Sequence, residues 1–190
     1  KVFLLTDTNT NRDCLTVFRS KVKCDFTLLV MKAGEQHKHL DTCTQLWREL
    51  SKLGADRNTL LINLGGGVVT DLGGFVACAY KRGIDFVNVP TTLLSMVDAS
   101  VGGKTGIDLD QLKNQIGIIQ EPNFVLVDPV FLNTLPKDEF RSGYAEMLKH
   151  GLIQDPAYFE KLTDYDSDIK GIGEHIFHSI GIKAEVVAQD

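Results

Sequence analysis

Short hydrophobic runs alternate with helical patterns through the first 128 residues of this chain. Each run is almost continuously apolar, which is typical of strands buried on both faces of a parallel sheet. Helical spacing of apolar residues is clearest over 40–53 and 68–81. Such alternation predicts an open α/β sheet with right-handed crossovers between its strands. The expected strands are 2–6, 26–31, 59–64, 84–89 and 124–127.

The pattern changes after residue 128, where strand-like runs stop and helical spacing continues. We therefore expect an α/β domain over residues 1–128, followed by an all-α region over 129–190. The first part has no net charge, and the second carries the whole net charge of −5. The last helical pattern continues to the end of the chain without a stop signal, which predicts a piece of a longer protein. The expected helices after the boundary are 131–135, 138–152, 157–162 and 169–187.

Composition argues against some classes of protein. With 43% hydrophobic and 24% charged residues, the 190-residue chain resembles an ordinary globular domain. No apolar run approaches the roughly 20 residues of a membrane span. The acidic balance argues against general nucleic-acid binding. The four cysteines form no CxxC pair, so we expect reduced and mostly buried thiols in a cytoplasmic protein. They are Cys14, Cys24, Cys43 and Cys78.

The connections that follow the expected strands predict where a ligand would bind. In open α/β sheets, ligands bind beyond the carboxyl ends of the strands. Five connections meet this condition, and a site would be assembled from them. They are 6–9, 32–38, 65–71, 90–98 and 128–135.

Three glycines, 65–67, follow one of these strands and open the next helix. Glycines there allow a tight turn and let backbone N–H groups approach an anion at the positive end of the helix. The pattern is not the dinucleotide fingerprint, because Thr70 stands where the third glycine would fall. From spacing, phosphate binding and a simple packing turn both stay open. Inside the helix, Gly73 and Gly74 each cost about 1 kcal/mol relative to alanine, which predicts that a strand or a ligand packs closely against them.

A second glycine turn places Asp98 and Lys104 on its two sides. Lys104 resembles a phosphate-binding lysine, but Val97 stands where a Walker A loop has its first glycine, which excludes that motif. Lys113 and Asn114 add a second cation and an amide nearby. From spacing alone, a ligand site and solvated charges on a hairpin are equally favoured.

Glu146, Lys149 and His150 lie at positions i, i+3 and i+4 of an expected helix, so they share one face. Spacing alone favours a solvated face with an ion pair, because Glu146 has no good partner for a metal ion nearby in the sequence. We expect His175 and His178 to be exposed, because the apolar stripe of their helix lies opposite them.

Taken together, these motifs resemble those of the 3-dehydroquinate synthases, within the sugar-phosphate cyclase family. The resemblance runs in order through essentially the whole chain. Its longest motifs are GGGVVTDLGGF at 65–75, VPTTLLSMVDASVGGKTGID at 89–108 and SGYAEMLKHGLI at 142–153. Shorter ones are TDTNT at 6–10, AGEQHK at 33–38, KRG at 81–83, KNQIG at 113–117, FLNTLPKDE at 131–139 and IKAEVV at 182–187.

The resemblance implies a Rossmann-like, NAD⁺-binding domain over 1–128 and the first helices of a metal- and substrate-binding domain over 129–190. It implies a lyase of the shikimate pathway to aromatic amino acids, which converts the keto-acid phosphate DAHP into 3-dehydroquinate and phosphate. Bound NAD⁺ would oxidise a substrate hydroxyl, after which phosphate leaves by β-elimination. Hydride then returns, the ring opens, and an intramolecular aldol reaction closes the carbocycle. A zinc ion, or cobalt in its place, would polarise the reacting oxygens.

The resemblance also implies roles for individual residues. Glu146 would be a metal ligand, which replaces the solvated-face interpretation, and Arg82 would reach the phosphate of a neighbouring subunit in a homodimer. The other substrate-side residues would be Asp98, Lys104, Asn114, Lys149 and Lys183, with Lys104 and Lys149 nearest the phosphate. At the cofactor we expect Asp7, Asn9, Glu35 and Lys38 on the adenosine half, with Gly34, Gly66, Gly67, Val68, Asp71, Thr91, Thr92, Lys104, Lys113, Phe131, Thr134, Leu135 and Glu139 around the rest.

Two histidine zinc ligands of the family fall beyond the stretch given, and His175 and His178 do not match them. We therefore expect this stretch to bind NAD⁺ without turning over DAHP. The alternatives are another sugar-phosphate cyclase, a polyol dehydrogenase on the same scaffold, and a bare nucleotide-binding module. Lys104, Asn114 and Lys149 argue against the last two, which would leave these residues without a phosphate to bind.

Overall fold

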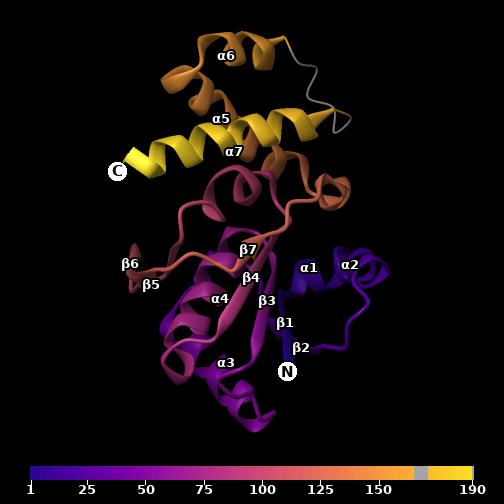
Figure 1. Ribbon diagram of the computed structural model, residues 1–190, viewed down its shortest axis with the longest axis vertical. Coiled ribbons are helices and arrows are strands. Elements are labelled where there is room, and N and C mark those ends of the chain that lie inside the picture. Colours follow the sequence, from indigo (N-terminus) through magenta and orange to yellow (C-terminus); the bar gives the residue numbers. More distant parts are fainter. Residues whose placement is uncertain (165–170, 190) are drawn as a thin grey trace.

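The computed structural model describes residues 1–164 and 171–189 of the chain (Figure 1). The main sheet has five parallel strands in the order β2-β1-β3-β4-β7. The five expected strands are confirmed, with small shifts at their ends and with the last one shortened to two residues. The strands are β1 (Val2–Asp7), β2 (Thr27–Met31), β3 (Leu60–Gly65), β4 (Asp85–Pro90) and β7 (Phe124–Val125).

Alternate residues of the central strands are buried on the two faces of the sheet. In β1, Phe3 and Leu5 pack into the core beneath α3 (Leu40–Lys52) and α4 (Gly67–Ala79). Leu4 packs into the core on the opposite face. This period of two follows from the pleat of a strand, and burial on both faces explains the continuous apolar runs.

Two short helices that the apolar pattern did not predict follow β1. They are α1 (Thr8–Asp13) and α2 (Leu15–Lys21). Each buries a single residue within its bounds, Thr10 in α1 and Phe18 in α2. A helix with one buried position has no apolar stripe of helical period, so the pattern could not reveal it.

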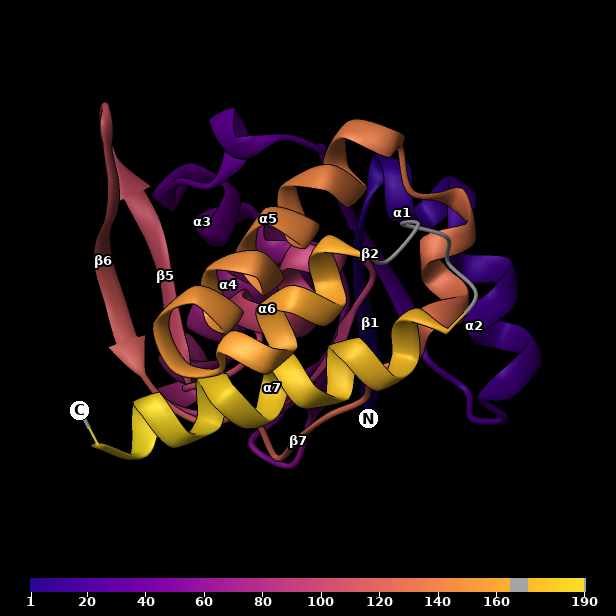
Figure 2. The ribbon, with the colours of Figure 1, turned by 90° about the horizontal axis from the view of Figure 1, so that it is seen from above.

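An antiparallel hairpin of β5 (Lys104–Leu109) and β6 (Leu112–Ile119) stands apart from the main sheet (Figure 2). The glycine turn at 102–103 thus leads into a hairpin, which by itself does not decide between solvated charges and a ligand site. A π-helical turn at Ser95–Ala99 leads into it. β6 is exposed along nearly its whole length, and for that reason it shows no apolar alternation.

Strands pack against the two glycines inside α4. A Cβ added to Gly74 would lie 2.6 Å from Thr105 Cγ2 of β5, and one added to Gly73 would collide with the Asn63 carboxamide of β3. Of the two partners that the glycines allowed, the structure shows strands.

The described residues that follow β7 form helices, as expected. They form a 3-10 helix (Pro129–Thr134), α5 (Lys137–Gln154), α6 (Pro156–Thr163) and α7 (Ile172–Gln189). The first two residues of the expected helix 169–187 lie outside the described residues. Further 3-10 helices are Glu35–His37 and Tyr80–Arg82. In both views α7 crosses above the carboxyl end of the sheet (Figures 1 and 2).

One of the two hydrophobic clusters runs from the sheet into the helices. Leu4 of β1 belongs to the same cluster as Met147 of α5 and Ile182 of α7. The boundary near residue 128 therefore does not interrupt the core. In the described part of the chain, no helix has the length and apolar character that crossing a membrane requires.

Candidate active site

A cavity of about 530 Å³, the first cavity, lies beyond the carboxyl ends of the strands. All five connections that the topology singled out contribute to its lining, as expected for an open α/β sheet. Of the expected cofactor residues, all but Lys104 and Lys113 line it: Asp7, Asn9, Gly34, Glu35, Lys38, Gly66, Gly67, Val68, Asp71, Thr91, Thr92, Phe131, Thr134, Leu135 and Glu139.

The amino terminus of α4 reaches this cavity with glycines in place of side chains. Gly66 is the N-cap, with extended backbone angles of φ −75° and ψ −171°. A Cβ on Gly66 would lie 2.9 Å from Thr92 Cγ2. The first N–H groups of a helix have no partner within it and carry its positive end. An anionic group can therefore approach the backbone of Gly66 and Gly67 directly.

Residues near α1 also line the first cavity, although the sequence did not single them out. They are Thr10, Asp13 and Cys14. The Asp7 carboxylate caps α1 by accepting hydrogen bonds from the N–H groups of Asn9 at 2.9 Å and Thr10 at 2.8 Å. Because α1 was not predicted, the residues that its turn brings to the cavity were not predicted either. Four further lining residues were not among the expected cofactor residues, although Ala33 and Leu94 lie in two of the expected connections: Ala33, Leu94, Ala99 and Pro136.

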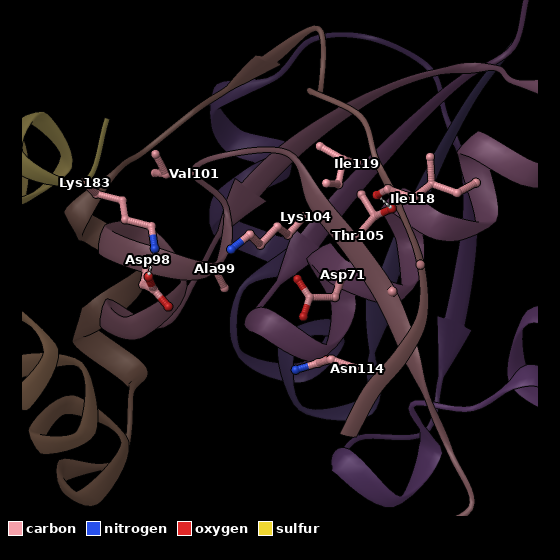
Figure 3. Close-up of a pocket in the computed structure, with 12 residues that line it drawn as sticks. Asp71, Asp98, Ala99, Val101, Lys104, Thr105, Asn114, Ile118, Ile119 and Lys183 are labelled. Carbon is pink, nitrogen blue, oxygen red and sulfur yellow. Dashed lines mark hydrogen bonds and ion pairs between the residues drawn. The ribbon is translucent and has the colours of Figure 1, made fainter. Parts of the chain in front are cut away.

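A second cavity of about 440 Å³ adjoins the first, and Asp71 lines both. Figure 3 shows Asp71 among the residues that line the second cavity. Lys104 of β5 and Asn114 of β6 form one side of it. On the opposite side, Lys183 of α7 donates to Asp98 Oδ1 at 2.6 Å. Four of the expected substrate-side residues thus surround one cavity. Lys104, which was also expected at the cofactor, lines this cavity and not the first.

A buried ion pair lies between the two cavities. The side chain of Lys38 is 4% exposed, and its Nζ donates to Asp71 Oδ2 at 2.7 Å and to Asn114 Oδ1 at 2.6 Å. Burial raises the pKa of Asp71, and the charge of Lys38 offsets part of this effect. The ammonium expected on the adenosine half of a cofactor therefore contacts Asp71, which lines both cavities, and Asn114, which lines the second.

Three potential metal ligands meet beside the second cavity. Asp98, Glu146 and His150 each offer one ligand atom, and these atoms all lie within 4.8 Å of one another. Two carboxylates and an imidazole are donors that Zn²⁺ and Co²⁺ accept. Each carboxylate also contacts a lysine, Asp98 through Lys183 and Glu146 Oε1 through Lys149 Nζ at 2.7 Å.

His150 is buried, so the expectation of a solvated face is wrong for this residue. It is 2% exposed, its Nδ1 lies 2.6 Å from Ser179 Oγ of α7, and its Nε2 lies 3.4 Å from Glu146 Oε1. Burial lowers the pKa of His150, which favours the neutral imidazole that binds metals. The i, i+4 spacing placed His150 beside Glu146. It could not show that α7 covers His150.

Two other expected residues, Lys113 and Arg82, line neither the first nor the second cavity. Lys113 Nζ pairs with Glu35 Oε1 at 3.2 Å and is exposed. Arg82 lines a third cavity of about 380 Å³, together with Arg57 and Glu121. Its backbone is left-handed, with φ +69°.

The two histidines of α7 differ in exposure. His178 is exposed as expected, and its Nε2 lies 2.9 Å from Asp155 Oδ2. His175 is half-buried with its ring centroid 5.9 Å from that of Tyr158, so the expectation of exposure is wrong for it. α6, which carries Tyr158, packs over this part of α7, and a single-helix pattern does not show that.

Two family models together match most of the chain. The model described as 3-dehydroquinate synthase N-terminal matches residues 28–142, and the one described as 3-dehydroquinate synthase C-terminal matches residues 143–190. The chain belongs to the 3-dehydroquinate synthase family. The resemblance inferred from the motifs is thereby confirmed.

Curated members of the family match this chain over much of its length. The 3-dehydroquinate synthase of Parabacteroides distasonis is 42% identical over 194 residues, which cover 100% of this chain and 55% of that protein. The 3-dehydroquinate synthase of Sulfurovum sp. is 48% identical over 164 residues, which cover 86% of this chain and 47% of that protein. This family member therefore spans about half the length of the curated relatives it matches.

Solved structures of sugar cyclases share its fold. A 2-deoxy-scyllo-inosose synthase complexed with carbaglucose-6-phosphate, NAD⁺ and Co²⁺ matches with a TM-score of 0.84 and 26% identity, over 98% of this chain and 54% of that one. A 2-epi-5-epi-valiolone synthase from Streptomyces hygroscopicus with NAD⁺ and Zn²⁺ bound also matches with a TM-score of 0.84 and 26% identity, over 100% and 55%. These likenesses confirm the predicted fold class.

Proposed function

We propose that this chain is the dinucleotide-binding part, and the start of the metal-binding part, of an enzyme that converts DAHP into 3-dehydroquinate and phosphate. The observation that carries the proposal is the pair of adjoining cavities that share Asp71. The first has a glycine-lined helix terminus suited to a pyrophosphate, and the second has Lys104 and Asn114. Identity of 42% to a 3-dehydroquinate synthase over the whole chain supports the choice of substrate.

The first cavity suits NAD⁺. Its glycine turn lets a pyrophosphate reach the positive end of α4, where a Cβ on Gly66 would crowd Thr92. Asp71 would accept hydrogen bonds from ribose hydroxyls, and Glu35 would do so at the adenosine end. When bound, NAD⁺ supplies a hydride acceptor that is regenerated within the reaction. Two related cyclase structures contain the same cofactor.

The second cavity suits a sugar phosphate. Lys104 offers a compact cation to phosphate oxygens, and Asn114 offers an amide to a hydroxyl. Lys183 would bind the substrate carboxylate, and Asp98, which it orients at 2.6 Å, would accept from a hydroxyl. As the C–O bond to phosphate breaks, its electron pair leaves with the phosphate. The fixed charge of Lys104 stabilises that developing dianion, with Lys149 expected beside it.

The cluster of Asp98, Glu146 and His150 suits a Zn²⁺ or Co²⁺ ion, because its donors are carboxylates and a neutral imidazole. Glu146 would be the ligand, and when bound the ion supplies Lewis-acid polarisation of substrate oxygens. The Lys149 ammonium on Glu146 and the Lys183 ammonium on Asp98 balance the carboxylate charges in its absence.

The second candidate is another sugar-phosphate cyclase, because the two solved synthases described above share the fold and contain NAD⁺ with a divalent metal ion, one of them together with carbaglucose-6-phosphate. The full-length protein, loaded with NAD⁺ and Zn²⁺, distinguishes the two when phosphate release is measured with DAHP and with glucose 6-phosphate in parallel. We expect rapid release from DAHP only. Release from glucose 6-phosphate alone would favour the second candidate, and release from neither would contradict the first.

Assembly and cellular location are part of the same proposal. We propose a homodimer in which Arg82 reaches a phosphate bound by the partner, and a cytoplasmic enzyme. The motif resemblance supports the first point, and Arg82 lines neither the first nor the second cavity, so a phosphate bound by it would lie elsewhere. All four cysteines are free thiols, which supports the second.

A further inference from the structure

Lys38 connects the two cavities and carries a further inference, which rests on the proposed function. We propose that Lys38 is a positioning residue that couples them: a dinucleotide in the first cavity acts through Lys38 to order Asn114 and the β5–β6 hairpin, which forms one side of the second cavity. Lys38 lines the first cavity, Asn114 lines the second, and Asp71 lines both.

Three contacts tie the loop after β2 to the hairpin. Lys38 Nζ donates to Asn114 Oδ1 at 2.6 Å, and the N–H of Asp108 donates to the carbonyl oxygen of Lys38 at 2.8 Å. The third contact joins Lys113 Nζ to Glu35 Oε1 at 3.2 Å. These contacts bring both ends of the hairpin turn against the segment that lines the first cavity.

Of the two contacts made by side chains, the one made by the Lys38 ammonium is buried. Its side chain is 4% exposed, whereas that of Lys113 is 71% exposed. An exposed ion pair contributes little, because water competes for both charges. A buried ammonium must keep its hydrogen-bond acceptors, so Lys38 holds Asp71 and Asn114 at fixed positions.

The outer strand of the hairpin, β6, has little packing of its own. β5 packs against α4 and buries Thr105 and Ile107, but β6 is exposed along nearly its whole length, and a hairpin strand without further packing is only marginally stable. Asn114 lies in β6 with a left-handed backbone at φ +54°, and its N–H donates to Asp108 Oδ1 at 2.8 Å. Asn114 is thus held at two points, its backbone N–H by Asp108 and its carboxamide by Lys38.

A ligand in the first cavity would act on the same contacts. Ribose hydroxyls bound to Asp71 would fix the carboxylate that Lys38 contacts, and the adenosine half would fix the loop that contains Glu35 and Lys38. Both effects would restrict the ammonium and hence Asn114. By linkage, a substrate that binds Asn114 would in turn strengthen dinucleotide binding.

Amide hydrogen exchange of residues 104–119, measured by mass spectrometry with and without NAD⁺, tests the coupling. In the wild-type chain we expect NAD⁺ to slow exchange of the hairpin about tenfold, a typical size for coupling between two sites. Lys38→Met should abolish this response. Because Lys38→Met leaves Asp71 buried without its ion pair, Asn114→Gly provides a second variant, which keeps the ion pair and tolerates the positive φ.

Two further variants separate positioning from general damage. Asn114→Asp keeps an oxygen acceptor for Lys38 and tolerates a left-handed backbone. NAD⁺ should therefore slow exchange of the hairpin in this variant as it does in the wild type, unlike in Asn114→Gly. Lys32→Met makes the same change as Lys38→Met at an exposed lysine of the same loop, and it should respond like the wild type.

Each outcome has a definite meaning. If NAD⁺ binds Lys38→Met and Asn114→Gly and protects their hairpins as strongly as it protects the hairpin of the wild type, the coupling is overturned and the proposed function stays intact. NAD⁺ that binds the wild type without protecting the hairpin would do the same. Failure of the wild-type chain to bind NAD⁺ at all would overturn the proposed cofactor, and the coupling with it.

Discussion

Burial controls the protonation of two cysteines in the core. It raises the pKa of Cys14 to about 11 and that of Cys43 to about 12, from an ordinary value of 9.0. Between pH 9 and 11 the unfolded chain has released protons that the folded chain still holds. A group whose pKa is raised by folding stabilises the folded state below its unfolded pKa, and that stabilisation is lost as pH rises.

We therefore expect the free energy of unfolding to be insensitive to these thiols below about pH 8 and to fall between pH 9 and pH 11. Urea unfolding followed by circular dichroism at several pH values checks this. The Cys14→Ala, Cys43→Ala double variant is the control and should show a shallower decline. An equal decline in both proteins would show that other groups cause it.

Single-residue properties were predictable from the sequence only where they depend on local spacing. The i, i+4 spacing placed Glu146 and His150 together, and the structure agrees. The burial of His150 depends on Ser179 of α7, which lies 29 positions away in the sequence. A contact of that kind leaves no trace in the pattern of α5, so the exposure of His150 was wrongly predicted.

At the scale of elements, the apolar pattern identified the elements that bury several residues. The strands of the main sheet are buried on both faces, and α3 and α4 each bury four or more residues at helical spacing, so all of these were predicted. The short α1 and α2 and the exposed β6 bury too few residues to show a period. The glycines that begin α4 were the most informative signal, because their positions correspond to a helix terminus at the first cavity.

That helix terminus can be tested by adding a charge to it. A Cβ on Gly67 would lie 3.4 Å from Ala99 Cβ, an ordinary contact, so Gly67→Asp should fold. An aspartate in the first turn stabilises a helix through its dipole, but it opposes a pyrophosphate. Juxtaposed like charges cost several kcal/mol, so we expect the dissociation constant for NAD⁺ to rise about 100-fold or more.

Isothermal titration calorimetry measures this change, with Gly67→Asn as a control of nearly equal size and no charge. The asparagine variant should lose much less affinity. Equal losses in the two variants would show that the added side chain blocks the cavity by its volume and that the charge at the helix terminus is unimportant.

At the scale of the whole molecule, topology placed the first cavity correctly. Parallel strands end at one edge, so the five connections had to meet there, and all five line the first cavity. The second cavity was less predictable, because it needs the hairpin to stand beside α4 and α7 to cross above the sheet. Lys104 and Lys183 are 79 positions apart in the sequence, and only this packing brings them to one cavity.

The residues present at each cavity predict how the 190-residue chain behaves on its own. Residues from all five connections line the first cavity, so we expect NAD⁺ to bind. Metal binding should be weak, because Glu146 and Asp98 are already held by lysines and the resemblance places two histidine ligands beyond Lys183. Residues 184–190 contain no histidine.

With NAD⁺ and Zn²⁺ supplied, the chain should release no phosphate from DAHP above the buffer rate, whereas the full-length protein should release it rapidly. Phosphate release by the chain that is abolished by a chelator and by Glu146→Gln would contradict this expectation. That outcome would assign the metal site to Asp98, Glu146 and His150 alone.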